Sequence, residues 1–294
     1  MTEHGGDPAD VGLVLLRSPE GIDPFYGDLI AGLEDVLHPR GMRVLLRSVP
    51  TSADVTGAYR HWIESGLVAG IVVSDLTPDD ARPAMLSALG MPHVTLGGLL
   101  TLPDDAVVRI DNDAAMHRAV EHLASLGHRV VGRVSGPVRY LHTQARDRAF
   151  LAGLAAIGGS GRIVVGDYSA ASGVSGTLAL LGHRQRPSAI IYDNDVMAVA
   201  GLDAARAAGL AVPRDLSILA WDDSTRCRLA TPALSAMSHD VRGLGVLAGE
   251  VLLRLLDAGP VEDVTAPTPV LVDRGSTAPP SSPLPTPAPP PPGR

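Results

Sequence analysis

Short apolar runs alternate with amphipathic segments of helical period along almost the whole chain. Short apolar runs bounded by turn residues are typical of buried strands, whereas apolar positions three and four residues apart indicate helices. The expected strands are Val11–Leu16, Arg43–Arg47, Gly70–Val73, His93–Leu96, Val107–Ile110, Val130–Val134, Ile163–Val165, Ala189–Tyr192, Ser217–Ala220 and Val270–Val272. The expected helices include Phe25–Leu37, Ala53–Ser65, Ala114–Leu126, Arg146–Ala156, Val196–Ala208 and Val241–Leu256. This alternation predicts an α/β protein whose sheets are parallel and carry helices on both faces.

Glycines mark the ends of several expected helices, because glycine adopts the left-handed backbone of a C-cap at little cost. They are Gly41, Gly90, Gly127, Gly209 and Gly259. The expected strands are too many for one sheet of usual size. A chain of 294 residues is long enough for two lobes that each bury a core, so we expect two lobes.

Composition excludes several functions. The net charge is −8 and all 24 basic side chains are arginine, so Walker-A phosphate binding and Schiff-base chemistry, which need a lysine, are excluded. An acidic chain without a basic cluster is also a poor non-specific binder of nucleic acid. Cys227 stands alone, which rules out internal disulfides and multi-thiolate metal sites and favours a small buried hydrophobe.

The two ends of the chain differ from its body. The start, MTEHGGDPAD, is polar and lacks the basic and apolar regions of a secretory signal. No apolar run approaches the ~20 residues of a membrane span, so we expect a cytoplasmic protein without membrane contact. From Ala278 the sequence is rich in proline and poor in residues that can form a core. We therefore expect disorder in residues 1–10 and 278–294; binding of the tail to a proline-recognising domain is the less favoured alternative.

Enzyme motifs are incomplete in this chain. His117 and His122 are five residues apart and would lie on different helix faces, which disfavours metal binding. Gly173-Val174-Ser175-Gly176 is followed by Thr177 where a nucleophile elbow needs glycine, and Gly243-Leu244-Gly245 lacks the third glycine of a dinucleotide site. Clustered carboxylates could suggest a glycosidase, but the sequence does not fix their separation. We expect no catalytic site, metal or cofactor.

The stretch from Ala189 to Ser224 reads AIIYDNDVMAVAGLDAARAAGLAVPRDLSILAWDDS, in which an acidic cluster follows each of two apolar runs. Ligands of open α/β sheets bind at such strand ends. In residue type and spacing this stretch resembles the sensor core of LacI/GalR-type transcriptional regulators. Other stretches extend the resemblance from Val11 to Pro280, among them DPFY at 23–26, VEHLASLGH at 120–128, Arg146 with Phe150, and RGSTAPP at 274–280.

The resemblance implies a fold and a division of the chain. It implies two Rossmann-like lobes of the periplasmic binding protein type I kind, with three interlobe crossings and a ligand cleft between the lobes. One lobe would comprise residues 11–110 and 241–268, and the other residues 111–240 and 269–277. The missing signal favours the regulators over their periplasmic sugar-binding relatives, and the family usually forms homodimers.

The family motifs also imply effector-binding residues. Arg146 would hold hydroxyls or a carboxylate of the effector, because its guanidinium donates to two oxygens at once; the alternative is a solvated helix arginine like Arg148. Asp222 would accept hydrogen bonds from effector hydroxyls or ring nitrogens, while Asp223 caps the next turn. The amide of Asn194 suits sugar recognition, although turn chemistry at the strand end is nearly as well supported. Asp195 is expected to be the N-cap of the following helix.

Seven further residues complete the candidate set. Phe25 and Tyr26 are adjacent aromatics at a family pocket position, where an aromatic face stacks on a sugar or base; the alternative is that one of them packs into the core. Asp111 opens the second lobe, where interlobe hydrogen bonding is the alternative role. Tyr140, His142 and Tyr168 lie at positions where relatives place variable contacts that set specificity. His239 lies where a polar side chain of the family often faces the ligand.

The expected function is therefore the sensing and dimerisation core of a transcriptional regulator that binds a small polar effector, a sugar or a nucleoside-like molecule. Family members carry a helix-turn-helix and a hinge helix before the first strand, whereas ten residues precede Val11 here. A misassigned start, a trimmed sensor and a naturally headless paralogue all fit that difference. Operator DNA is a partner only if a helix-turn-helix exists upstream. The alternative function is a headless sugar-binding protein that does not touch DNA.

Overall fold

The computed structural model describes residues 10–17, 21–97, 106–259 and 263–281. The chain forms two compact units. Unit 1 comprises residues 1–111, 140–142 and 240–267, and unit 2 comprises residues 112–139, 143–239 and 268–294. Apart from the short excursion at 140–142, the chain therefore passes between the units three times. None of the helices within the described ranges combines the length and the apolar character that a membrane span requires.

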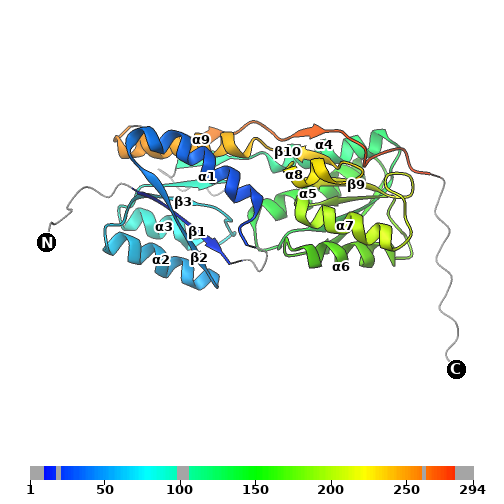
Figure 1. The fold of residues 1–294 in the computed structure, drawn as a ribbon, viewed down its shortest axis with the longest axis horizontal. Coiled ribbons are helices and arrows are strands. Elements are labelled where there is room, and N and C mark those ends of the chain that lie inside the picture. The colour runs from blue at the N-terminus through cyan, green and yellow to red at the C-terminus, as the bar shows by residue number, and fades with distance from the viewer. Residues whose placement is uncertain (1–9, 18–20, 98–105, 260–262, 282–294) are drawn as a thin grey trace, which may run out of the picture. The chain divides into compact units, whose positions relative to one another are not determined.

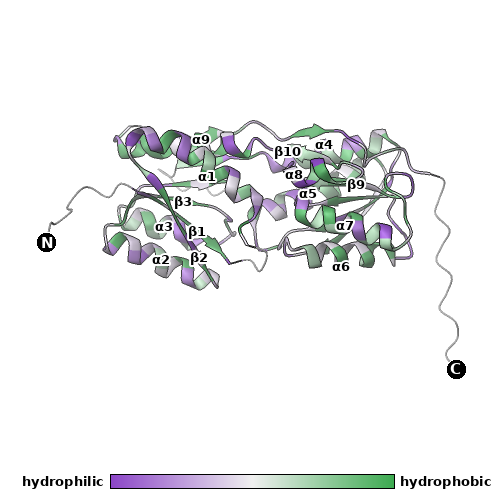
Figure 2. Ribbon diagram, in the orientation of Figure 1, coloured by the Kyte–Doolittle hydropathy of each residue, from purple (hydrophilic) through white to green (hydrophobic). Residues whose placement is uncertain are grey.

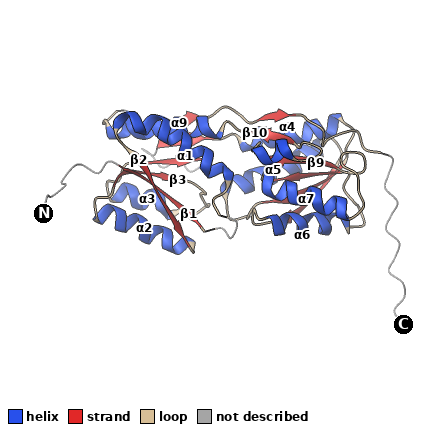
Figure 3. Ribbon diagram, in the orientation of Figure 1, coloured by secondary structure: helices blue, strands red, loops and turns tan. Residues whose placement is uncertain are grey.

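Unit 1 contains a parallel sheet of six strands in the order β11-β5-β4-β3-β1-β2. Its strands are β1 (Asp10–Leu16), β2 (Arg43–Val49), β3 (Val68–Val73), β4 (His93–Leu96), β5 (Ala106–Arg109) and β11 (Val264–Thr265). Its helices are α1 (Pro24–Leu37), α2 (Ser52–Glu64), α3 (Ala81–Ala88) and α9 (Val241–Leu256), with a 3-10 turn at His38–Arg40. The strands are parallel because a helix returns the chain between most of them (Figure 3).

Helices α1 and α9 pack closely in unit 1, although more than 200 residues separate their starts. Figure 1 shows them side by side, α1 in blue and α9 in orange. Glycines make this approach possible. A Cβ atom on Gly32 of α1 would lie 1.9 Å from the carbonyl oxygen of Arg242, and one on Gly245 of α9 would lie 2.2 Å from that of Leu29. The buried faces of both helices join one apolar cluster with β1 and β3.

Unit 2 repeats this topology in a second sheet of six strands, in the order β12-β10-β9-β8-β6-β7. Its strands are β6 (Val130–Ser135), β7 (Ser160–Val165), β8 (Ala189–Tyr192), β9 (Ser217–Trp221), β10 (Ser235–Ser238) and β12 (Val270–Val272). Only β12 runs antiparallel to its neighbour. Its helices are α4 (Asn112–Ser125), α5 (Leu141–Ala156, whose first two residues group with unit 1), α6 (Ala170–Leu181), α7 (Asp195–Ala207) and α8 (Thr225–Leu229).

Several helices of both units, among them α1, α2, α4 and α9, are amphipathic and carry green and purple residues along the same helix in Figure 2. The central strands β8 and β9 are buried throughout, as expected for parallel strands covered on both faces. The expected fold class, an α/β protein with two parallel-dominated sheets, is therefore confirmed.

The structure corrects several details of the sequence prediction. Helix α5 begins at Leu141, five residues before the expected start at Arg146. Strands β10 and β11 are additional to the expected set. Of the five expected cap glycines, Gly259 does not have a positive φ angle, and Ala258 has one of 55° instead.

The two ends of the chain, where disorder is expected, are described in part. Residues 1–9 and 282–294 lie outside the described residues. Asp10, however, belongs to β1 and pairs with Arg43 in β2. At the other end, the carbonyl of Ala278 accepts hydrogen bonds from Ser217 and His128. Backbone pairing and side-chain contacts therefore order Asp10 and residues 278–281, where the composition alone predicts disorder.

Candidate functional site

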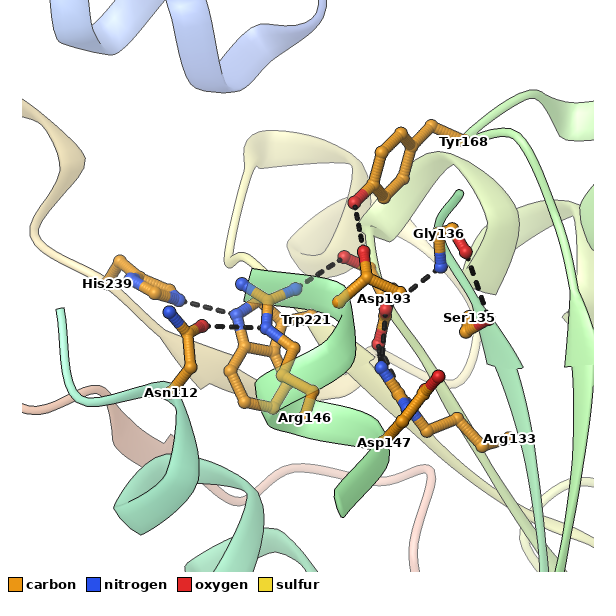
Figure 4. Close-up of polar contacts among 11 residues, drawn as sticks. Asn112, Arg133, Ser135, Gly136, Arg146, Asp147, Tyr168, Asp193, Trp221 and His239 are labelled. Carbon is orange, nitrogen blue, oxygen red and sulfur yellow. Dashed lines mark hydrogen bonds and ion pairs between the residues drawn. The ribbon is translucent and has the colours of Figure 1, made fainter. Parts of the chain in front are cut away.

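Polar side chains gather where the parallel strands of unit 2 end. Gly136 follows β6, Asp193 follows β8, Asp222 follows β9 and His239 follows β10. The carboxyl ends of these strands meet at one edge of the sheet because the strands are parallel. Helix α5 brings Arg146 to the same edge (Figure 4). Loops at this edge are free of the packing demands of the sheet, which is why ligands of such folds bind there.

The guanidinium of Arg146 is held on three sides. Its centre lies 4.0 Å from the centroid of the Trp221 ring, in cation–π geometry. Its Nε donates to Oδ1 of Asn112 at 2.8 Å, and its Nη1 donates to the carbonyl of Asp193 at 3.4 Å. Nη2 makes no hydrogen bond within the described part of the chain, and it keeps some contact with solvent. The side chain is only 8% exposed, so it presents this nitrogen in a fixed orientation.

Trp221 connects Arg146 to the end of β10. Its indole N–H donates to Nε2 of His239 at 2.5 Å, which requires that nitrogen to be unprotonated. Oδ1 of Asp222 lies 3.9 Å from the same Nε2. Trp221 is completely buried, so its role is to support Arg146 and not to stack on a ligand. Asp222 itself has a φ of 68°, a left-handed conformation that turns the chain sharply away from β9.

In the cluster that follows β8, Asn194 and Asp195 lie at the start of α7. Asn194 is the N-cap of α7, since its Oδ1 accepts the N–H of Met197 at 2.9 Å, and its Nδ2 donates to the carbonyl of Tyr168 at 3.0 Å. The expected N-cap, Asp195, is instead the first residue of the helix and accepts a hydrogen bond from Ser224. The amide of Asn194 thus takes part in the turn at the strand end, and its role in effector binding stays a prediction.

Tyr168 has a φ of 72° and its hydroxyl lies 3.3 Å from Oγ1 of Thr143 on α5. Its ring covers Gly136, where a Cβ atom would come within 2.2 Å of the phenol. The sequence placed Tyr168 among the specificity residues. The structure brings it to the loop after β6 and to the cap of α7, beside Asp193.

Beneath this edge lies a buried cluster of charges. Arg133 in β6 pairs with Asp193 through Nε to Oδ1 at 3.0 Å and Nη2 to Oδ2 at 2.6 Å, and it also binds Asp147. Oδ2 of Asp193 accepts the N–H of Gly136 at 2.9 Å. Burial alone would raise the pKa of Asp193, but the charges of Arg133 and Arg146 hold it below its usual value. Burial raises the pKa of Asp147, although Arg133 opposes the shift.

The remaining candidates fall in unit 1 or at its border. The hydroxyl of Tyr26, at the start of α1, donates to Oδ2 of Asp75 at 2.8 Å, and burial followed by the charge of Asp75 raises its pKa well above the usual value. Phe25 packs edge-on against Tyr26 with ring centroids 5.3 Å apart. Tyr140 and His142 stack on each other at 5.3 Å and group with unit 1.

Sequence reasoning missed the residues that hold Arg146 in place. Asp111 is exposed at the end of unit 1, whereas its neighbour Asn112 is buried and contacts Arg146. Trp221 carries no local signal beyond its place before the acidic pair Asp222-Asp223. The one available signal was Arg133, a lone charge inside an apolar run, because a charge buried in a strand needs a partner.

Hydrogen-bond donors and acceptors at this edge suit a small polar molecule. The described residues include no group of three or more histidine, cysteine, aspartate or glutamate side chains with the geometry of a metal site. Cys227 is buried, and burial raises the pKa of its thiol, so within this fold it behaves as an apolar residue.

Known proteins similar to this chain include transcriptional regulators. A family model described as a periplasmic binding protein-like domain matches residues 120–277. The HTH-type transcriptional regulator MalR of Streptomyces coelicolor is 30% identical over 282 residues, covering 91% of this chain and 81% of MalR. The regulator CelR of Thermobifida fusca is 29% identical over 241 residues, covering 80% and 69%.

Solved structures agree with these relatives. A LacI family transcriptional regulator from Bifidobacterium animalis subsp. lactis superposes with a TM-score of 0.86 at 34% identity, covering 94% of this chain and all of that one. The CelR–cellobiose complex superposes with a TM-score of 0.82 at 26% identity, covering 91% and 84%. The resemblance seen in the sequence is therefore confirmed, and the chain belongs to the LacI/GalR family of transcriptional regulators through a periplasmic-binding-protein-like domain.

Proposed function

We propose that this domain senses a small polar effector, a sugar or a nucleoside-like molecule, and thereby controls the DNA binding of a cytoplasmic homodimeric regulator. The observation that carries the proposal is the fixed guanidinium of Arg146. Trp221, Asn112 and the carbonyl of Asp193 hold it, and its Nη2 keeps a donor for a ligand. A donor that is already immobilised loses little entropy on binding, which is the basis of preorganised recognition.

The relatives support a polyhydroxylated effector. One structure similar to this chain is named as a complex of CelR with cellobiose. Hydroxyl groups both donate and accept hydrogen bonds, so they match an arginine donor beside the carboxylate of Asp222, which lies at the same sheet edge. That the chain resembles regulators along 91% of its length favours sensing over catalysis.

Control of DNA binding requires that the effector prefers one of two states of the regulator, because a ligand that binds both states equally shifts nothing. We infer that the effector-bound and effector-free domains differ in how a dimer presents its DNA-binding heads. Sedimentation of the purified chain with and without effector tests the dimer directly.

A thermal-shift screen of neutral sugars, sugar phosphates, nucleosides and purines tests the sensing proposal. A ligand at one hundred times its Kd should stabilise the native state by about 2.7 kcal/mol, which is readily seen as a rise in Tm. The screen is run on the wild type, on Arg146→Ala and on Arg148→Ala. Arg148 is the matched control, because it lies on the same helix and is exposed.

A ligand that raises the Tm of the wild type and of Arg148→Ala, but not that of Arg146→Ala, supports the proposal and identifies the effector class. A ligand that stabilises all three proteins equally would contradict the role of Arg146. A panel without any stabilising ligand would contradict the proposed effector class.

A further inference from the structure

Arg133 is an unusual residue for the centre of a sheet. Strand β6 lies between β7 and β8, and the Arg133 side chain is completely buried there. Its partner Asp193 has a side chain that is likewise 0% exposed. Replacing a buried ion pair by apolar residues of similar volume is often neutral or stabilising. The stability of the sheet alone therefore gives no reason for two charges at this place.

The contacts of the pair lead toward Arg146 by two routes. Arg133 grips the carboxylate of Asp193 in a bidentate pair, and the carbonyl of that same residue accepts the hydrogen bond from Nη1 of Arg146. Arg133 also binds Asp147, the residue that follows Arg146 on α5. One guanidinium thus fixes both the acceptor that Arg146 uses and the helix position beside it (Figure 4).

Charge supports the same arrangement. The negative charge of Asp193 attracts Arg146 as well as Arg133, and the pKa of its carboxyl is lowered by both arginines. Gly136, at the end of β6, donates its N–H to the same carboxylate at 2.9 Å, so the loop after β6 is tied to the cluster too. The charges of Arg133 and Arg146 thus compensate those of Asp147 and Asp193 beneath the sheet edge. Of these four residues, Arg146 is the one that extends to the edge itself.

We propose that Arg133 and Asp193 form a positioning pair that sets the orientation of the Arg146 guanidinium over Trp221 and thereby the affinity for the effector. The affinity part of this inference rests on the proposed function. The orientation of Arg146 does not, and it can be measured without any ligand.

Trp221 supplies that ligand-free measurement. The chain has two tryptophans, and Trp62 lies in unit 1, so difference emission spectra between variants of unit 2 report on Trp221. Arg146→Met removes the cation from the indole face and defines the spectrum of an uncovered ring. Arg148→Ala, at an exposed position of the same helix, is the control that should leave the spectrum unchanged.

Two variants test the pair. Asp193→Asn keeps the shape and an acceptor for Gly136 but removes the charge. The double variant Arg133→Met, Asp193→Leu replaces the pair by apolar volume, which should preserve the fold if the single variant does not fold. Both are measured for Tm, for Trp221 emission and, with the ligand from the thermal-shift screen, for Kd.

We expect both variants to move the Trp221 spectrum toward that of Arg146→Met and to raise the effector Kd by about tenfold or more, as for the loss of one charge-assisted hydrogen bond. Folded variants that keep the wild-type spectrum and Kd, while Arg146→Met changes both, would overturn the inference. If no ligand depends on Arg146, the proposed function fails separately, and the emission spectra still decide whether the pair positions Arg146.

Discussion

Asp222 and Asp223 are adjacent carboxylates with different surroundings. Asp222 follows β9 in a left-handed conformation, at a φ of 68°, beside His239. Asp223 pairs with Arg274 at 2.7 Å, and both side chains are largely buried. One residue therefore carries backbone strain at the sheet edge, whereas the other anchors the C-terminal segment of unit 2.

We expect Asp222→Gly to leave the free energy of unfolding unchanged or to raise it by up to about 1 kcal/mol, because glycine adopts a positive φ without a Cβ clash. The same variant should bind the effector more weakly, because it loses an acceptor. Urea unfolding and titration of the effector measure the two effects on one protein preparation.

Asp223→Ala is the complementary change. It should cost about 1–3 kcal/mol, because Arg274 loses its carboxylate partner in a partly buried place. Effector binding should stay as in the wild type. A loss of affinity in Asp223→Ala equal to that in Asp222→Gly would show that the two carboxylates do not divide their roles in this way.

For individual residues, the sequence predicts those site positions that are fixed by the local pattern of one helix or strand. Family motifs and strand ends point to Arg146 and Asp222, because each lies at a fixed spacing from its own helix or strand. Asn112, Trp221 and Arg133 meet Arg146 or Asp193 only through the order of the strands in the sheet. Nothing in the local pattern records that order, so the supporting residues could not be assigned.

Among the described elements, α1 and α9 make the most extensive helix–helix contact, and Gly32 at this contact allows a direct test. Gly32→Ala should destabilise the protein by about 1–3 kcal/mol, because the added methyl group overlaps the carbonyl of Arg242. The overlap is with backbone, so a change of rotamer cannot relieve it. Urea unfolding measures the free-energy change.

Gly27, on the same helix, is the matched control, because a Cβ atom there meets nothing within 4 Å. Gly27→Ala should stabilise the helix by up to about 1 kcal/mol, the difference in helix propensity between the two residues. If Gly32→Ala is as stable as Gly27→Ala, the helices separate more easily than their packing indicates.

The sequence predicts those helices and strands whose apolar periodicity is strong. Strand β10 is not predicted, because Ser235–Ser238 reads SAMS and contains no β-branched or aromatic residue. Its pairing with β9 and β12 buries it, and that pairing connects distant parts of the chain. Tertiary context thus made a strand from residues with no strand signal of their own.

At the scale of the whole molecule, histidines hold the C-terminal segment onto unit 2. His128 is 1% exposed; its Nδ1 lies 2.8 Å from Oγ of Ser188, and its Nε2 lies 3.0 Å from the carbonyl of Ala278. Nε2 of His122 lies 3.1 Å from Oγ1 of Thr277. Burial lowers the pKa of both imidazoles, although the Ala278 carbonyl opposes the shift in His128 and the charge of Asp273 opposes it in His122.

Stability should therefore fall as the pH drops below the usual histidine pKa of about 6.5. In the window between the lowered native pKa and that value, the unfolded chain binds protons that the native chain does not, so acidification favours unfolding. Above this window the histidines contribute no pH dependence. Urea unfolding at a series of pH values measures the slope.

His128→Asn should flatten this slope, since it removes one of the two groups whose pKa is lowered. His61→Asn, at an exposed position of α2, should leave the slope unchanged. Equal slopes for the wild type and His128→Asn would contradict the prediction that the pKa of His128 is lower in the native state than in the unfolded state.

The last strands of the two sheets have a consequence for the nascent protein. Strand β11, at Val264–Thr265, completes the sheet of unit 1, and β12, at Val270–Val272, completes that of unit 2. Both strands emerge from the ribosome after the other strands that the structure describes. Neither sheet is complete until these strands have been translated. We therefore expect the growing polypeptide to expose apolar surface until Val272 has emerged, when both sheets are completed almost together, and to depend on chaperones during that interval.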